Sequence, residues 1–267
     1  MNSSILVPTD FSEAANKALQ HAVLMSKNSG AKIYLLNLCK STSEIPSAKI
    51  NLEKQAGTIE NLEQIVRVGD FKAIPKISKE LSVEMIFLGT HGASGMQKVM
   101  GSNALKLVTN SEVPFIIVQK DSPNPNGYKK IMVPTSFHFE NKQKIMAVAA
   151  LAKYFGSKIY FIYNDSDVLM KKKSLQNLNG MKKFLDSKGL SYDEVISTGK
   201  NFNQDTLVSA ANIGAELIAI MNMQKNDLLG TGLFGKNYEQ ELIMNDQKIP
   251  ILILNPKTTQ LLGNTLG

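Results

Sequence analysis

Cysteine, tryptophan and histidine are scarce in this sequence. Cys39 is the single cysteine among 267 residues, tryptophan is absent, and histidine occurs three times. A single cysteine excludes an intrachain disulfide, and without a recognisable base nearby Cys39 is expected to be a buried structural thiol. The histidines, His21, His91 and His138, have no metal-ligand spacing with cysteine or carboxylates. We therefore expect no metal centre, and we place His21 at the surface or at the edge of the core.

Long apolar runs and basic clusters are also lacking. No run approaches the ~18 apolar residues of a membrane-spanning helix, and the first residues lack the basic and apolar regions of a signal peptide. The net charge is +7, and residues 171–173 form the one run of three lysines. Such a short run favours a solvated helix face over a nucleic-acid surface. We expect a cytoplasmic protein that contacts neither membrane nor nucleic acid.

Two common nucleotide-binding motifs are missing. No glycine-rich loop ends in Lys-Ser or Lys-Thr, which argues against a P-loop NTPase. No Gly-x-Gly-x-x-Gly follows the first expected strand, which argues against a dinucleotide-binding Rossmann domain.

A different glycine-rich stretch covers residues 88–95, between the apolar run 84–87 and a segment with helical spacing from residue 102. Glycine lets a backbone approach a ligand closely, and the unpaired amides at the start of a helix attract phosphate. The alternative is a sharp turn without a ligand.

The first half of the chain alternates apolar strands with amphipathic helices. Ser12 is expected to cap the first helix and Gly30 to end it. The polar region 40–61 reads as a loop with a short helix, and residues 71–81 form one helical face. The alternation predicts parallel βαβ units and a doubly wound sheet. The expected strands are residues 4–7, 32–39, 62–68, 85–89 and 114–118.

The chain then repeats itself. Residues 131–137 repeat residues 5–11 at an offset of 126, and the offset grows to 136 at Pro114 and Pro250. Small loop insertions produce such a drift, so we predict a tandem duplication. Its parts are a first domain at 1–120, a linker at 121–128, a second domain at 129–256 and a C-terminal tail at 257–267.

The two expected fifth strands are apolar and uncharged, and an exposed edge of that kind invites pairing. We therefore expect the two fifth strands to pair antiparallel, so that the chain forms an internal pseudo-dimer. Further association into a homodimer stays open.

In residues 7–12, 89–92, 101–102 and 113–118 the chain resembles the universal stress protein family, and the resemblance covers the chain as two tandem copies. It implies for each copy an α/β Rossmann-like fold: a five-stranded parallel sheet of order 3-2-1-4-5 with two helices on each face. Some members bind ATP or a related adenine nucleotide such as AMP or ADP, and others bind none. Most have no established reaction and act in stress tolerance.

The nucleotide pattern of that family resembles Gly-x-x-Gly, a gap of nine residues, and then Gly-Ser or Gly-Thr. Gly89 and Gly92 fit, but the gap before Gly101 and Ser102 holds eight residues. Asn103 has the alternative of an ordinary first-turn helix residue, and His91 that of an ordinary loop residue. Mg²⁺ is a candidate companion of the phosphates. The phosphate end implied by the resemblance comprises Gly89, His91, Gly92, Gly101, Ser102 and Asn103.

The resemblance places the ribose and the base at the ends of the first two strands. Asp10 would lie near the ribose or base, Pro8 and Thr9 would line the cleft, and the backbone around Leu38 would face the adenine edge. Ligands of open α/β sheets bind beyond the carboxyl ends of the strands where the strand order reverses, which agrees with this position. The alternative for Asp10 is a cap or turn residue.

The second copy departs from the pattern. Ser136 replaces Asp10, and Met221, Asn222, Met223 and Gln224 stand where residues 89–92 stand in the first copy. Gly235 remains, but Lys236 replaces Ser102. Without the paired glycines the backbone cannot close on phosphates, so we expect no ATP in the second copy. A small anion beside Lys236 stays open, because a cation at a helix start opposes the helix dipole.

The leading hypothesis is a tandem universal stress protein that binds ATP or a related adenine nucleotide in its first domain and catalyses no reaction. One alternative is an interaction module of the same fold that dimerises without nucleotide. The other is a slow ATPase, although no general base is evident near the expected phosphates.

Overall fold

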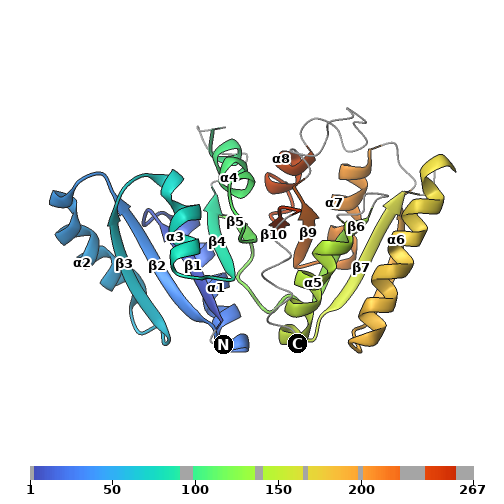
Figure 1. Cartoon of the computed structure of the whole chain (residues 1–267), viewed down its shortest axis with the longest axis horizontal. Helices are drawn as coiled ribbons and strands as arrows, with labels where there is room; N and C mark the ends of the chain where they lie inside the picture. The colour runs from blue at the N-terminus through green and yellow to red at the C-terminus, as the bar shows by residue number, and fades with distance from the viewer. Residues whose placement is uncertain are drawn as a thin grey trace.

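The computed structural model describes residues 3–90, 99–135, 141–164, 168–197, 201–222 and 238–256. Its strands form one ten-stranded sheet with helices on both faces (Figure 1). The first half contains β1 (Ser4–Thr9), α1 (Glu13–Ser29), β2 (Lys32–Cys39), the 3-10 helix η1 (Thr42–Glu44), α2 (Ile45–Ala56), β3 (Leu62–Val68), the 3-10 helix η2 (Phe71–Ala73), α3 (Ile74–Glu80), β4 (Met85–Thr90), α4 (Val99–Thr109) and β5 (Phe115–Gln119).

The second half repeats this succession, apart from the two short 3-10 helices. It contains β6 (Lys130–Thr135), α5 (Asn141–Phe155), β7 (Lys158–Asn164), α6 (Val168–Ser187), β8 (Tyr192–Ser197), α7 (Phe202–Ile213), β9 (Leu217–Met221), α8 (Tyr238–Ile243) and β10 (Ile251–Leu254). Below, the first domain denotes β1 to β5 with their helices, and the second domain denotes β6 to β10 with theirs.

The local signals for the first helix act as predicted. Ser12 caps α1, and its hydroxyl oxygen accepts a hydrogen bond from the Ala15 amide at 3.2 Å. Gly30 ends the helix in the left-handed conformation, with φ 74°. The region 40–61 differs from expectation, because α2 has 12 residues and is not a short helix. The helix begins at Ile45 and has Pro46 in its first turn, where the missing N–H of proline is not needed.

The strand order within each domain is the predicted 3-2-1-4-5. The whole sheet runs β3-β2-β1-β4-β5-β10-β9-β6-β7-β8. All neighbouring strands are parallel except β5 and β10, which pair antiparallel with Ile116 opposite Leu252. The predicted pairing of the two fifth strands is therefore confirmed, and it removes two apolar edges from water.

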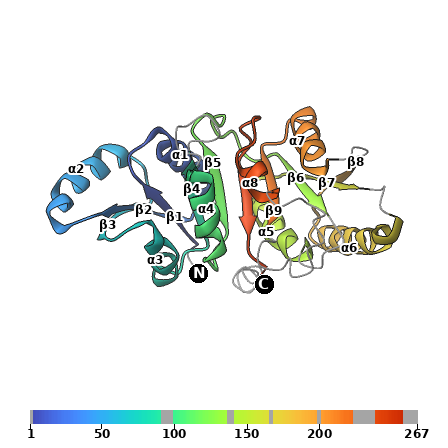
Figure 2. The same cartoon turned by 90° about the horizontal axis from the view of Figure 1, so that it is seen from above.

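Two helices of each domain cover each face of the sheet, as the family resemblance implied. The core on one face joins α1 and α2 with α5 and α6, and includes Leu19, Leu52, Val148 and Leu185. The core on the other face joins α3 and α4 with α7 and α8. Figure 2 shows α4 and α8 side by side where the two domains meet. Each face therefore has one apolar layer that runs through both domains.

Polar side chains cross the boundary between the domains at both ends of β5. At its carboxyl end, the Gln119 amide nitrogen donates to the Asn245 carbonyl at 2.8 Å. At its amino end, the Asn255 amide nitrogen donates to the carbonyls of Val108 and of Ser111, the latter at 2.7 Å. Both side chains tie a strand end of one domain to the helix end of the other.

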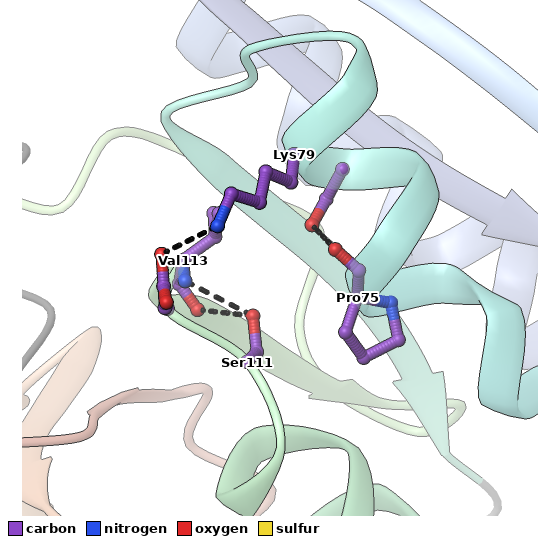
Figure 3. Close-up of polar contacts among 6 residues, drawn as sticks. Pro75, Lys79, Ser111 and Val113 are labelled. Atoms are coloured by element: carbon purple, nitrogen blue, oxygen red, sulfur yellow. Dashed lines mark hydrogen bonds and ion pairs between the residues drawn. The ribbon is translucent and has the colours of Figure 1, made fainter.

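The turn that precedes β5 is tied to α3 as well (Figure 3). The Lys79 ammonium lies 3.7 Å from a carboxylate oxygen of Glu112. The Ser111 hydroxyl accepts from the Val113 amide at 3.0 Å and donates to the Val113 carbonyl at 3.1 Å. The ion pair is exposed and contributes little, so the serine turn and the buried Val113 side chain fix where β5 begins.

His21 lies in the core, which corrects its expected place at the surface or core edge. It is 2% exposed, its Nδ1 lies 2.8 Å from the Tyr128 hydroxyl, and its Nε2 lies 3.3 Å from the Pro123 carbonyl oxygen. Burial lowers the His21 pKa to about 4. The chain that follows β5 folds back over α1 and covers this histidine, which helical spacing alone could not reveal.

Candidate functional site

A cavity of about 630 Å³ opens at the carboxyl ends of the first four strands, where the strand order reverses. It is lined by the turn after β1, the end of β2, the start of α2, the turn after β3 and the end of β4. Pro8, Thr9, Asp10, Leu38 and Gly89, all expected at the site, line this cavity together. Its volume is typical of a pocket for a small molecule or cofactor.

The turn after β1 is held by its own side chains. The Thr9 hydroxyl accepts from the Phe11 amide at 2.9 Å and donates to Gln55 of α2 at 2.9 Å. Phe11 has a φ of 64°, a costly conformation for a bulky residue. Asp10 accepts from the Ser12 amide at 3.1 Å. The structure thus gives Asp10 the turn role weighed above and also leaves it exposed at the cavity.

Gly89 is required by close packing between β4 and α1. A Cβ atom added there would lie 2.2 Å from the Ala14 carbonyl oxygen and 2.6 Å from the Ala15 nitrogen, far inside contact distance. Gly89 is not among the residues with positive φ. From the sequence, glycine was expected here for its backbone freedom and for close approach of the backbone to a ligand. The structure gives close approach as the reason, and the nearest backbone is the first turn of α1.

The expected phosphate end is described in part. His91 and Gly92 lie outside the described residues. Gly101, Ser102 and Asn103 belong to α4, which begins at Val99 and not at residue 102 as expected. The earlier start follows from tolerance of glycine in a first turn, where backbone amides have no partner within the helix. The amide of Gly101 is among those unpaired groups, and Ser102 is not the residue that starts the helix.

The end of β2 carries polar groups that the sequence did not single out. The Asn37 amide nitrogen donates to the Thr9 carbonyl at 2.8 Å, and the Cys39 thiol lies 3.4 Å from the Asn37 oxygen. Cys39 is buried, as expected, and burial raises its pKa. A raised pKa keeps the thiol protonated, so Cys39 lines the cavity as an inert group.

Other cavity residues come from segments that contain no recognised sequence motif. They include Glu44, Ser47 and Asn51, at and just before the start of α2, and Asp70 and Phe71 after β3. The Gly69-Asp70 turn signal marks the end of β3, and the strand order brings that end beside β2. A search for turn residues after every strand of the sheet would therefore have found Asp70.

Two aligned positions of the second domain carry larger, buried side chains. Met221, which stands where Gly89 stands in the first domain, is 2% exposed at the end of β9. Lys144 of α5, aligned with Ala18 at the offset of 126, is 1% exposed, and its ammonium donates to the Pro134 carbonyl. Burial lowers the Lys144 pKa to about 7. Ser136, Met223, Gln224, Gly235 and Lys236 lie outside the described residues.

In comparisons with known proteins, the first half of the chain matches universal stress proteins. The model of the universal stress protein family matches residues 1–53 and 40–119. A universal stress protein of Methanocaldococcus jannaschii is 24% identical over 156 residues, which cover 45% of this chain and 96% of that protein.

Solved structures match over both halves. A universal stress protein of Archaeoglobus fulgidus has a TM-score of 0.73 at 20% identity, covering 94% of this chain and 96% of that one. A second match, from Pseudomonas aeruginosa, has a TM-score of 0.63 at 16% identity and covers 100% and 98%. At these identities the likeness concerns the fold, and the two-domain arrangement is shared.

Proposed function

The chain belongs to the universal stress protein family through its first 119 residues, and its second half repeats the fold; on this premise we propose that the first domain binds ATP or a related adenine nucleotide. The observation that carries the proposal is the cavity at the carboxyl ends of β1 to β4. It adjoins the only stretch of the sequence that fits most of the family's nucleotide pattern.

The dimensions of the cleft suit an extended nucleotide. Adjacent strands lie about 4.8 Å apart, so three steps from β4 to β3 span roughly 14 Å. The base and ribose would lie at the β2 and β3 end, beside Leu38 and Asp10, and the phosphates at the β4 end beside Gly89. Unpaired amides in the first turn of α4 would stabilise the phosphate charge.

We assign the protein a binding role in the stress response, without catalysis. The carboxylates that line the cavity, Asp10, Glu44 and Asp70, come from the β1, η1 and η2 side. The β4 end contributes Leu88 and Gly89 to the described lining, and neither can act as a general base. Mg²⁺ would accompany the phosphates, because it usually binds through phosphate oxygens and water with one or two carboxylates.

The proposed cellular place is the cytoplasm. Across the residues that the structure describes, no helix is long and apolar enough to span a membrane.

The experiment is mass spectrometry of nucleotide retained through gentle purification, followed by calorimetric titration with the nucleotide found. Asp10→Ala should weaken binding about 10- to 100-fold, the usual effect of losing a hydrogen bond to a charged group. Ser136→Ala, the change at the aligned position of the second domain, is the matched control and should leave affinity unchanged. Failure of the wild-type protein to bind ATP, ADP or AMP would refute the proposal.

A further inference from the structure

The second domain extends a lysine to the nucleotide side of the first domain. Lys248 lies in the turn between α8 and β10. Its ammonium nitrogen lies 3.4 Å from the side-chain oxygen of Gln119, the last residue of β5. Because β5 is antiparallel to β10, the carboxyl end of β5 meets the start of β10. The turn before β10 therefore lies on the same side of the sheet as the carboxyl ends of β1 to β4, where the first domain has its cavity.

The backbone of this turn is fixed by the first domain. The Ser122 hydroxyl donates to the Lys248 carbonyl at 2.7 Å, and the Gln119 amide nitrogen donates to the Asn245 carbonyl. Asn245 also closes the turn internally, since its side chain bonds both the amide and the carbonyl of Ile249 at 2.9 Å. Lys248 thus projects from a rigid support, and its half-buried position limits where its ammonium group can lie.

Lys248 has no acidic partner within the described part of the chain, which separates it from the neighbouring lysine. Lys120, one residue after Gln119, has its ammonium 3.9 Å from an Asp121 carboxylate oxygen. A half-buried cation without a counter-ion is costly unless an anion binds beside it. The charge of Lys248 is therefore available for a ligand.

A buried hydroxyl at the end of β4, the strand next to β5, also has no hydrogen-bond partner among the described residues. Thr90, the last residue of β4, is 4% exposed, and its hydroxyl oxygen has no hydrogen-bond partner among the described residues. Thr90 lies directly opposite Gln119 in the β4–β5 register. Strand alternation places both side chains on the face that α4 covers, because Leu88 and Ile117 belong to the core of that face. The hydroxyl and the Gln119 side chain that Lys248 contacts therefore share one face at two adjacent strand ends.

We propose that Lys248 binds the β- and γ-phosphates of the nucleotide held by the first domain, with the Thr90 hydroxyl as a second donor. This inference rests on the proposed function. The cation contacts the last residue of β5, and the unpartnered hydroxyl ends β4 one residue after Gly89, where the phosphates are proposed to lie. The second domain, which lacks the glycine pattern, would thus complete the site of the first. The site would prefer nucleoside di- and triphosphates over monophosphates.

The test compares ATP and AMP affinities by calorimetry for the wild-type chain, Lys248→Gln, Lys248→Arg and Lys120→Gln. Lys248→Gln should weaken ATP binding about tenfold or more and leave AMP binding within twofold, because AMP has no β- or γ-phosphate. Lys248→Arg keeps the charge and should stay close to wild type. Lys120→Gln, the neighbouring control, should leave both affinities unchanged. Thermal unfolding without nucleotide checks that each variant folds.

Equal losses for ATP and AMP, or no loss for ATP in Lys248→Gln, would overturn the inference. In that case ATP binding by the wild-type chain would still support the proposed function. A wild-type chain that bound neither nucleotide would refute the proposed function and this inference with it.

Discussion

The ends of β4 and β9 carry the clearest difference between the two domains. In the first domain Gly89 lets β4 approach the first turn of α1, with a cavity of about 630 Å³ beside it. In the second domain Met221 stands at the aligned position, buried among the core residues of β9. A side chain at Gly89 would collide with the backbone of α1, so the residue at this position limits how closely the helix approaches the strand end.

The helices beside these strands also differ, with a small residue in α1 and a large one at the aligned position of α5. Ala18 of α1 is small and buried, whereas Lys144 at the aligned position of α5 carries its ammonium to the end of β6. At this position a small core residue of the first domain is thus replaced by a buried charged side chain in the second. The sheet, the helix layers and the β5–β10 pairing are alike in both domains. These shared features do not depend on which residue stands at the end of β4 or β9.

Disrupting the β5–β10 pairing between the domains should have the largest effect on stability. Ile116 and Leu252 are opposite each other in β5 and β10, and both are fully buried. Replacing both with proline removes an N–H from each strand and should destabilise the protein by more than the roughly 0.5–3 kcal/mol of an ordinary point mutation. We expect the double variant to lose cooperative unfolding and protease resistance. Ile116→Val with Leu252→Val is the control, and wild-type stability of the proline variant would contradict the account of this boundary.

Exchanging the residues at the ends of β4 and β9 tests the comparison directly. Gly89→Met should force β4 and α1 apart, destabilise the protein by about 3–5 kcal/mol and abolish nucleotide binding. Met221→Gly should cost about 2–5 kcal/mol by leaving a cavity, without changing binding. Denaturant unfolding gives the free energies, and titration gives the affinities. Retained nucleotide affinity in Gly89→Met would show that the approach of β4 to α1 does not control the pocket.

A buried histidine gives the first domain its own pH dependence. The His21 pKa is about 4 in the folded chain against about 6.5 when unfolded, because burial disfavours the charged ring. Between these values the unfolded chain binds more protons, so stability should fall by about 2–3 kcal/mol as pH drops from 6.5 to 4. His21→Gln should flatten this part of the curve measured by denaturant unfolding. An unchanged slope would show that His21 does not titrate with folding.

A buried lysine makes the stability of the second domain depend on pH in a different, higher pH range. The Lys144 pKa is lowered to about 7 by burial, below an ordinary value of about 10.5. Stability should therefore rise with pH between about 7 and 10, where the unfolded chain holds the extra proton. Lys144→Met should remove this rise and stabilise the protein at pH 7 by about 1–2 kcal/mol. The matched change Ala18→Met in the first domain should instead destabilise by overpacking.

The fold could be predicted far more completely than the site. Hydrophobic periodicity, Ser12 and Gly30 were enough for the strands and the first helix of the first domain, and the internal repeat indicated the second domain. The length of α2 and the start of α4 differed from expectation. The antiparallel β5–β10 pairing followed from two apolar edges. Helix ends, strand periodicity and apolar strands are properties of short stretches, so they can be recognised in the sequence alone.

Contacts between distant segments were beyond the sequence. The burial of His21 under Tyr128 and Pro123 depends on the path of the chain after β5. Lys248 meets Gln119 across the domain boundary, at a separation of 129 residues. Asp70 and Phe71 reach the cavity because β3 lies beside β2. The His21 and Lys248 contacts have no sequence motif, since each arises from the packing of elements far apart in sequence. For Asp70 the turn after β3 is visible in the sequence, but its position beside β2 is not.

The most direct test of the central claim is the number of ATP molecules bound per chain, measured by equilibrium dialysis at saturating ATP. The account predicts one for the wild-type chain. Asp10→Ser introduces the residue of the second domain and should weaken binding about 10- to 100-fold, whereas Ser136→Asp should not add a site. Two molecules per chain, or undiminished binding by Asp10→Ser, would contradict the assignment of the site to the first domain.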